Sequence, residues 1–126
     1  MQAQKEKTPS PERIVSKVAK EQRIKKTLDF KKAYKEGKRF LSPRFVLYVR
    51  PNGLSHARIG VSIAKRHFKL ATKRNRLRRV AQELFRTKKA ARVSGFDFVI
   101  ASRGRREQDI NEAVRELRSL IAGNRR

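Results

Sequence analysis

The chain has 126 residues, enough for one domain, and its 35 Lys and Arg against 11 Asp and Glu give a formal net charge of +24. Self-repulsion on this scale destabilises a compact fold unless a polyanion is the normal companion, so we expect nucleic acid as the partner, with an anionic membrane surface as the second choice. The chain has no cysteine, no apolar run long enough to span a membrane and no segment like a signal peptide, which excludes disulfides and thiolate metal sites and predicts a cytoplasmic protein.

The first 22 residues differ in composition from the rest of the chain. They contain Pro9 and Pro11 and few large apolar side chains, which favours a mobile basic extension that can become helical after Pro11. Such an arm could contact RNA or could be a solvated tail, and the sequence leaves both open. We expect the folded domain to cover residues 23–122, followed by a basic tail at 123–126.

A short helix is predicted at the start of the domain, in the segment TLDFKKAYKEG at residues 27–37. Phe30 and Tyr34 share one face of this helix. Thr27 is a candidate N-cap, and Gly37 is a candidate for the residue that ends the helix.

Three strands are predicted from alternating apolar residues. Residues 44–50 and 57–65 are joined by the turn sequence Pro-Asn-Gly, which predicts an antiparallel hairpin. A short extra strand near Phe40 also fits the pattern. Residues 96–102, FDFVIAS, form a third strand that follows a helix, as in a βαβ unit.

The helix before that third strand contains a physical contradiction. Its segment KRNRLRRVAQELFR, residues 73–86, has an apolar stripe at helical spacing, made of Leu77, Val80, Ala81, Leu84 and Phe85. Its first turns are rich in Lys and Arg, although a helix N-terminus is partially positive and each exposed cation there costs about 0.3–1 kcal/mol. A phosphate-rich partner resolves the contradiction, because phosphates bind both cations and helix N-termini.

The last predicted helix begins after Asp109 and ends at Gly123. Asp109 and Glu112 have the spacing of a capping box, and an apolar stripe follows them. The predicted order is therefore α-β-β-α-β-α in a single α+β domain.

The residues do not suggest a protein catalyst. The acidic side chains are scattered over predicted caps and helix surfaces, so no pair is placed for acid and base catalysis. His56 and His67 are isolated from other candidate ligands, which favours surface or phosphate-proximal roles for both. No glycine-rich phosphate loop is present.

The basic segment between Lys65 and Arg92 is the strongest functional signal. Glu83 is its single acidic residue, and Arg, Asn and Gln project opposite the apolar stripe, whereas a merely solvated helix more often alternates Glu with Lys. Guanidinium and amide groups donate to phosphates and base edges. We therefore predict an RNA-binding face, with a charged helix that has no ligand as the alternative. The predicted residues are Lys65, Arg66, Lys69, Lys73, Arg74, Asn75, Arg76, Arg78, Arg79 and Arg86.

Aromatic residues predict a second surface. Phe30 and Tyr34 on the first helix and Val46 and Tyr48 on the first strand could line a concavity between helix and sheet. Unstacked bases pack on aromatic side chains for about 1–3 kcal/mol each with little sequence preference, which suits single-stranded RNA. Ordinary core packing is the alternative for Phe30 and Tyr34.

Several of these segments together resemble the bacterial ribonuclease P protein subunit. They are DFKKAYKEG, RFVLYV, RIGVSIAKR, KRNRLRRVAQELFR and GFDFVIASRG, and they lie within roughly residues 23–121. The centre of the match is RNRLRR at residues 74–79, between the paired strands and the third strand. The chain departs from the family at Gln82, where a further basic residue is usual.

The resemblance implies an α/β sandwich with a left-handed βαβ crossover, as in the ribosomal protein S5 domain 2-like fold. It also implies two partners: the catalytic RNA of ribonuclease P, which carries the Mg²⁺-dependent chemistry, and precursor tRNA, whose 5′ leader is removed. The basic helix would dock on RNA, and Phe30, Tyr34, Val46 and Tyr48 would hold the leader. It requires no metal bound to the protein, no DNA, no membrane and no protein oligomer.

Two other functions remain as alternatives. A ribosomal or general RNA-binding protein on a related fold has a similar composition. A nuclease that acts without an RNA subunit is the third class, although the scattered acidic residues do not favour it.

Overall fold

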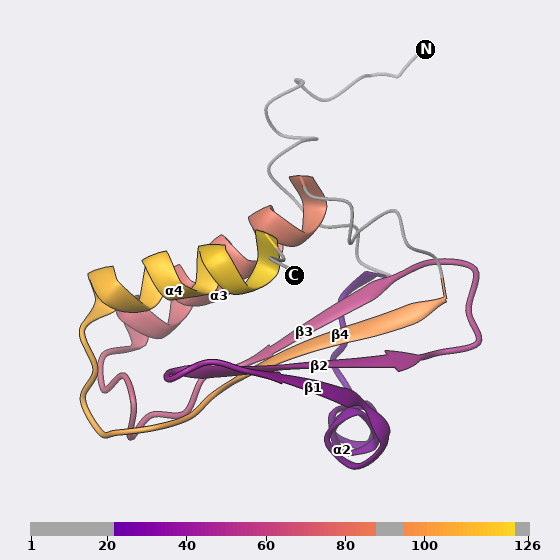
Figure 1. The fold of residues 1–126 in the computed structure, drawn as a ribbon, viewed down its shortest axis with the longest axis horizontal. Coiled ribbons are helices and arrows are strands. Elements are labelled where there is room, and N and C mark those ends of the chain that lie inside the picture. The colour runs from indigo at the N-terminus through magenta and orange to yellow at the C-terminus, as the bar shows by residue number, and fades with distance from the viewer. Residues whose placement is uncertain (1–21, 88–94, 123–126) are drawn as a thin grey trace.

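The computed structural model describes residues 22–87 and 95–122, and the predicted terminal extensions lie outside these ranges apart from Gln22. The elements are α2 (Thr27–Glu36), β1 (Lys38–Leu41), β2 (Phe45–Pro51), β3 (Arg58–Ser62), α3 (Ala71–Thr87), β4 (Phe96–Ser102) and α4 (Ile110–Ala122). Figure 1 shows α3 and α4 side by side on one face of the sheet and α2 on the other. This α+β order, including the extra strand at Phe40, confirms the predicted fold class.

The predicted antiparallel hairpin is wrong, because the strand order is β1-β2-β4-β3. β4 lies between β2 and β3, antiparallel to the first and parallel to the second. The turn sequence after β2 specifies a change of direction but not which strand becomes the neighbour. β4 is the better central strand because apolar side chains occupy both of its faces, with Ile100 in the core under α3 and α4 and Val99 in the core under α2.

Two hydrophobic cores cover the two faces of the sheet. The larger lies between the sheet and the helices α3 and α4 and includes Phe45, Phe85 and Leu117. The smaller lies under α2 and includes Ile24 and Val99. The predicted apolar stripe of α3 is confirmed, with four of its members buried and Val80 packed at the core margin.

The helix ends differ from the predicted caps in detail. Lys26, not Thr27, is the N-cap of α2, and its side chain makes no capping hydrogen bond. Gly37 does end α2, and its N–H donates to the Ala33 carbonyl over 2.8 Å. Its backbone is extended rather than left-handed, and a Cβ there would lie 2.6 Å from the same carbonyl oxygen. Glycine is therefore required here because any Cβ would clash with the Ala33 carbonyl oxygen, and not because the backbone needs a left-handed conformation.

The N-terminus of α4 makes half of the predicted capping box. The Glu112 N–H donates to Asp109 Oδ1 over 3.0 Å, as expected for the cap. The Glu112 carboxylate pairs with Arg44 instead of returning to the cap residue. The predicted end at Gly123 lies outside the described residues.

His67 is buried, so the predicted surface role is wrong. Its side chain is 2% exposed, and its Nδ1 lies 2.8 Å from Ser102 Oγ. The same hydroxyl oxygen accepts the Ala64 N–H over 2.8 Å, so Ser102 joins the imidazole to the backbone after β3. The Gln108 N–H donates to the His67 carbonyl over 2.9 Å. Pairing of the loops after β3 and β4, which sequence spacing does not show, is what buries this imidazole.

We expect His67 to make stability depend on pH. Burial, and then the positive charge of Arg66, lower the pKa of His67 below its ordinary value, despite an opposing hydrogen bond to the Gly104 backbone. The unfolded chain therefore binds the proton first, and the free energy of unfolding falls as pH drops below about 6.5, with a limiting slope of about 1.4 kcal/mol per pH unit. Urea denaturation at constant ionic strength measures this slope. His67→Gln should flatten this slope; equal slopes in wild type and His67→Gln would contradict the assignment.

Candidate RNA-binding site

The first turns of α3 present cations to solvent. Asn75, Arg76 and Arg79 are exposed, and the first turn contains no acidic residue. Within residues 22–87 and 95–122, Arg76 and Arg79 take part in no ion pair. Their guanidinium groups are therefore available to a phosphate backbone.

Arg74 and Arg78 also bind groups of the protein itself. Arg74 Nη1 donates to the Phe68 carbonyl over 2.9 Å and to the Lys69 carbonyl over 2.8 Å. Arg78 Nη1 donates to Asn75 Oδ1 over 2.7 Å. Arg74 thus stabilises the loop that leads into α3, so part of the cost of a cation at this helix end is offset inside the protein.

A second group of cations lies in the loops that follow β3 and β4. Lys65, Arg66 and Lys69 are exposed in the first loop, and Arg105 and Arg106 are exposed in the second. The loops touch, since the Glu107 N–H donates to the Arg66 carbonyl over 3.1 Å. Sequence reasoning missed Arg105 and Arg106, because only the parallel pairing of β3 with β4 places both loops at one end of the sheet.

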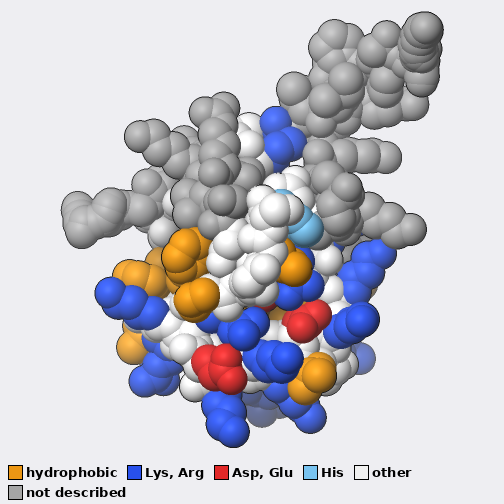
Figure 2. All heavy atoms as spheres, turned by 90° about the vertical axis from the view of Figure 1, so that its right-hand side faces the viewer, with side chains coloured by type: hydrophobic (Ala, Val, Ile, Leu, Met, Phe, Trp, Pro, Cys, Tyr) orange, Lys and Arg blue, Asp and Glu red, His pale blue; other side chains and the backbone are white. Residues whose placement is uncertain are grey.

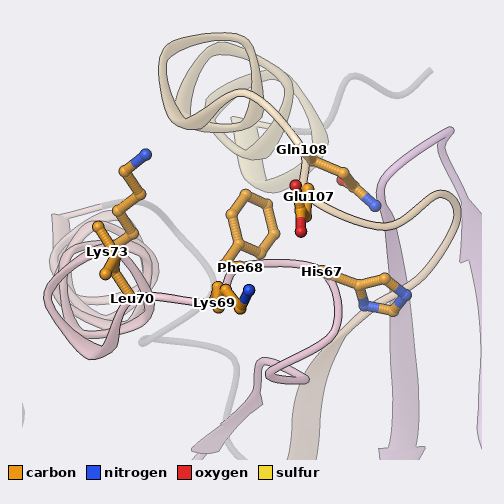
Figure 3. Close-up of a pocket in the computed structure, with 7 residues that line it drawn as sticks. All are labelled: His67, Phe68, Lys69, Leu70, Lys73, Glu107 and Gln108. Carbon is orange, nitrogen blue, oxygen red and sulfur yellow. The ribbon is translucent and has the colours of Figure 1, made fainter.

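A pocket of about 340 Å³ lies between these loops and the start of α3. In Figure 3, Lys73 and Leu70 lie on the α3 side and Glu107 and Gln108 on the other, with Phe68 between them. Lys69 and Lys73, both predicted to bind RNA, line this pocket. Among the described residues, no three His, Asp or Glu side chains are grouped so that they could hold a metal ion.

A second pocket, of about 410 Å³, joins the basic helix to the predicted aromatic surface. Its lining comes from α2, from the end of β3 and from α3. The lining residues are Thr27, Phe30, Lys31, Tyr34, Val61, Ser62, Ile63 and Arg78. Aromatic rings from α2 and a guanidinium group from α3 line the same pocket, which suits a chain of bases and phosphates.

The four predicted aromatic-surface residues occupy different depths. Phe30 and Tyr34 line the pocket, and their ring centroids lie 6.4 Å apart. Tyr48 stands behind Tyr34 at 5.0 Å and packs against the core under α2. Tyr34 is 39% exposed, whereas Val46 is 7% exposed in the sheet. The accessible part of this surface is therefore Phe30 with Tyr34.

Arg86 and the cations beyond it are placed differently from the rest of the predicted set. Arg86 is half-buried in the last turn of α3, and its Nε is buried without a hydrogen-bond partner among the described residues. Lys88, Lys89 and Arg92 lie outside the described residues.

Comparison with known proteins identifies the family of this chain. A family model described as ribonuclease P matches residues 18–123. The chain belongs to the ribonuclease P protein family. Among curated relatives, the ribonuclease P protein component of Thermotoga maritima is 40% identical over 82 residues, which cover 65% of this chain and 69% of the relative. That of Clostridioides difficile is 33% identical and covers 75% of this chain and 86% of its own length.

Solved ribonuclease P proteins share the fold. The Thermotoga maritima protein superposes with a TM-score of 0.60 at 32% identity and covers 79% of this chain and 94% of its own. A Staphylococcus aureus RNase P protein gives a TM-score of 0.64 at 26% identity and covers 78% and 86%. Family membership makes this chain the protein subunit of the endoribonuclease ribonuclease P, a tRNA-processing enzyme, with the ribonuclease P RNA as its partner.

Charge on the surface agrees with an RNA partner for this ribonuclease P protein. Figure 2 shows the end of the molecule on the right in Figure 1, where Lys and Arg side chains are spread widely and acidic side chains form small patches between them. None of the helices in the described ranges has the length and apolar character needed to span a membrane.

Proposed function

We propose that the pocket between α2, β3 and α3 holds the 5′ leader of precursor tRNA while the exposed face of α3 docks on the catalytic RNA. The main observation in support is that Arg78 of the basic helix and Phe30 and Tyr34 of α2 line the same pocket. The docking set is the predicted basic set, centred on Asn75, Arg76 and Arg79.

The pocket supplies two kinds of contact to a single strand. The rings of Phe30 and Tyr34 can stack on bases of any sequence, and Lys31 and Arg78 can neutralise phosphates. Lys31 is an addition to the predicted set, since a lone lysine on a basic helix has no distinguishing sequence signal. Mature tRNA lacks the leader, so these contacts favour precursor over mature tRNA.

We further propose that Mg²⁺ enters with the RNA subunit and the substrate. Two carboxylates are already occupied within the protein, Asp97 by Arg58 and Glu116 by Arg44. The cations near the pocket would reduce repulsion between leader and catalytic RNA, and the protein would then lower the Mg²⁺ concentration that cleavage requires.

Reconstitution with a bacterial ribonuclease P RNA tests the proposal. At low Mg²⁺, adding the protein should stimulate cleavage of precursor tRNA at the 5′ end of the mature sequence, while the protein without RNA should cleave nothing. Absence of stimulation together with tight binding to ribosomal RNA would favour a general RNA-binding protein instead.

The reaction that contains the protein but no RNA subunit also tests whether the protein is a nuclease by itself. One solved Staphylococcus aureus protein, 32% identical with a TM-score of 0.58, is described as a mutant with defective mRNA degradation activity. An mRNA substrate should therefore be included in this control reaction. Cleavage that persists in the absence of any RNA subunit would contradict the proposal that the chemistry belongs to the RNA.

Tyr34→Ala should lower the ratio of precursor to mature tRNA affinity. Loss of one stacked base is worth about 1–3 kcal/mol, or about 5-fold to 150-fold in this ratio. The half-exposed ring contributes less to the core, so the loss of stability should be the smaller effect. Equilibrium binding of both tRNAs to the reconstituted enzyme measures the ratio, with Tyr34→Phe as the control that keeps the ring. A lower melting temperature with an unchanged ratio would assign Tyr34 to the core alone.

A further inference from the structure

A row of charged residues crosses the sheet directly under α2. Arg50 of β2, Asp97 of β4 and Arg58 of β3 are aligned by the strand register. Asp97 is fully buried. Arg58 Nε and Nη2 donate to its two carboxylate oxygens over 2.9 and 2.8 Å, and Asn52 Nδ2 donates to Oδ1 over 2.8 Å. Arg50 Nη1 lies 3.5 Å from Oδ2.

The outer ends of this row reach both ends of α2. Arg58 Nη1 lies 3.5 Å from Asp29 in the first turn, and Arg50 Nη2 lies 3.3 Å from Glu36 in the last turn. Figure 1 looks along the axis of α2 while the strands run across the picture, so the helix crosses the strands. The row of charged residues also crosses the strands, so it runs along the helix. The buried Asp97 carboxylate therefore supports the ion pairs at both ends of α2.

Asp97 is the member that keeps the two arginines in place. Burial alone would raise the pKa of its carboxyl, but hydrogen bonds from Arg58 and Asn52 and the charges of Arg58 and Arg50 outweigh burial and lower the pKa below its usual value. The group is thus ionised at neutral pH. Without that charge, two partly buried guanidinium groups would face each other across β4 and would turn toward solvent.

The position of α2 determines the shape of the leader pocket. Phe30, Lys31 and Tyr34 lie between the two attached residues and form one wall, whereas the opposite wall comes from β3 and α3. The helix also touches the sheet directly, because a Cβ on Gly60 would lie 2.9 Å from the Phe30 ring. A small shift of α2 therefore moves both aromatic rings relative to Arg78.

We propose that Asp97 is a positioning residue for leader binding: through Arg50 and Arg58 it fixes both ends of α2, so that Phe30 and Tyr34 face Arg78 across the pocket. The inference rests on the proposed leader pocket. It assigns specificity for precursor tRNA to a buried ion-pair row that does not itself contact RNA.

The other face of the sheet offers a matched control. Glu116 of α4 accepts hydrogen bonds from Ser42 Oγ and the Arg44 N–H, each over 2.5 Å, and from Arg44 Nη1 over 2.9 Å. It resembles Asp97 as a hydrogen-bonded carboxylate paired with arginine, but it attaches α4 to the turn before β2. Glu116→Gln therefore removes a comparable charge without touching α2.

The test uses full-length protein reconstituted with the catalytic RNA. Asp97→Asn should raise KM for precursor tRNA and lower the ratio of precursor to mature tRNA affinity by about three- to tenfold, a part of the stacking free energy of one or two bases. Saturating kcat and affinity for the catalytic RNA should stay within about twofold, because the face of α3 is unaltered. Glu116→Gln should leave the ratio unchanged.

A second variant covers the case in which Asp97→Asn does not fold. The double variant Asp29→Asn with Glu36→Gln removes both attachments of α2 and keeps the buried carboxylate, and it should lower the ratio in the same way. An unchanged ratio in this folded double variant, or an equal loss in Glu116→Gln, would overturn the inference. If the wild-type protein itself does not distinguish precursor from mature tRNA, the result instead contradicts the proposal that the pocket binds the leader.

Discussion

Replacing Phe85 by alanine is expected to lower the free energy of unfolding by about 3–5 kcal/mol, a large share of the 5–15 kcal/mol typical of a domain. Phe85 is 1% exposed, and its ring meets Phe98 of β4 edge-on with centroids 5.9 Å apart. It also shares the larger core with Leu117 of α4. Because the N-terminus of α3 carries cations that oppose the helix dipole, this helix depends on its buried stripe more than most. Urea denaturation of the free protein measures the loss.

Val80→Ala is the matched variant for this prediction. Val80 lies on the same helix but is only partly buried at the core margin, so its loss should cost about 1 kcal/mol. RNA should raise the free energy of unfolding of every variant by about 2.7 kcal/mol when its concentration is 100 times the dissociation constant. A Phe85→Ala variant no less stable than Val80→Ala would show that the ring does not anchor α3.

The elements of this fold follow from local pattern, whereas their pairing does not. The stripe of α3 and the residues of β4 are set by side-chain periodicity, which the sequence displays directly. The position of β4 between β2 and β3 depends on contacts between distant segments. The predicted hairpin failed for that reason, since the turn after β2 is compatible with either neighbour.

The candidate site likewise contains some residues that the local sequence pattern predicts and others that only the packing of distant segments brings in. The exposed cations of α3 were predictable because one helix face carries them all. Lys31 and Ser62 reach the pocket only through packing of α2 on the end of β3. Arg74 shows a further limit, because its charge suggests RNA binding while one of its nitrogens donates to two carbonyl groups of the preceding loop. Whether it also contacts RNA stays a prediction.

That use of Arg74 explains part of the contradiction in the α3 sequence. A cation at a helix N-terminus is unfavourable when it only faces the partial positive charge of the helix. Arg74 instead directs a nitrogen to the loop carbonyls, so protein groups compensate its charge. Arg76 and Arg79 lie beyond the first turn of α3 and take part in no ion pair within the described residues, so their charges remain available to a phosphate backbone.

Replacing Arg76 and Arg79 together by alanine should weaken binding of the catalytic RNA by about one to two orders of magnitude near physiological salt, because two charge-assisted contacts are lost. Each phosphate contact contributes about 0.7–0.9 to the slope of log affinity against log salt, so the slope should become shallower by about 1.4–1.8. Stability should change little, since both side chains are exposed. A salt titration of RNA binding measures the slope.

The double variant Arg115→Ala with Arg118→Ala removes the same charge from exposed positions on α4 and should leave most of the slope intact. Arg74→Ala should differ from both, because it loses the loop hydrogen bonds and so reduces stability as well as charge. Equal slopes in the α3 and α4 double variants would mean that net charge alone attracts RNA. A larger change for α3 would instead locate the phosphate contacts on its exposed face, at Arg76 and Arg79.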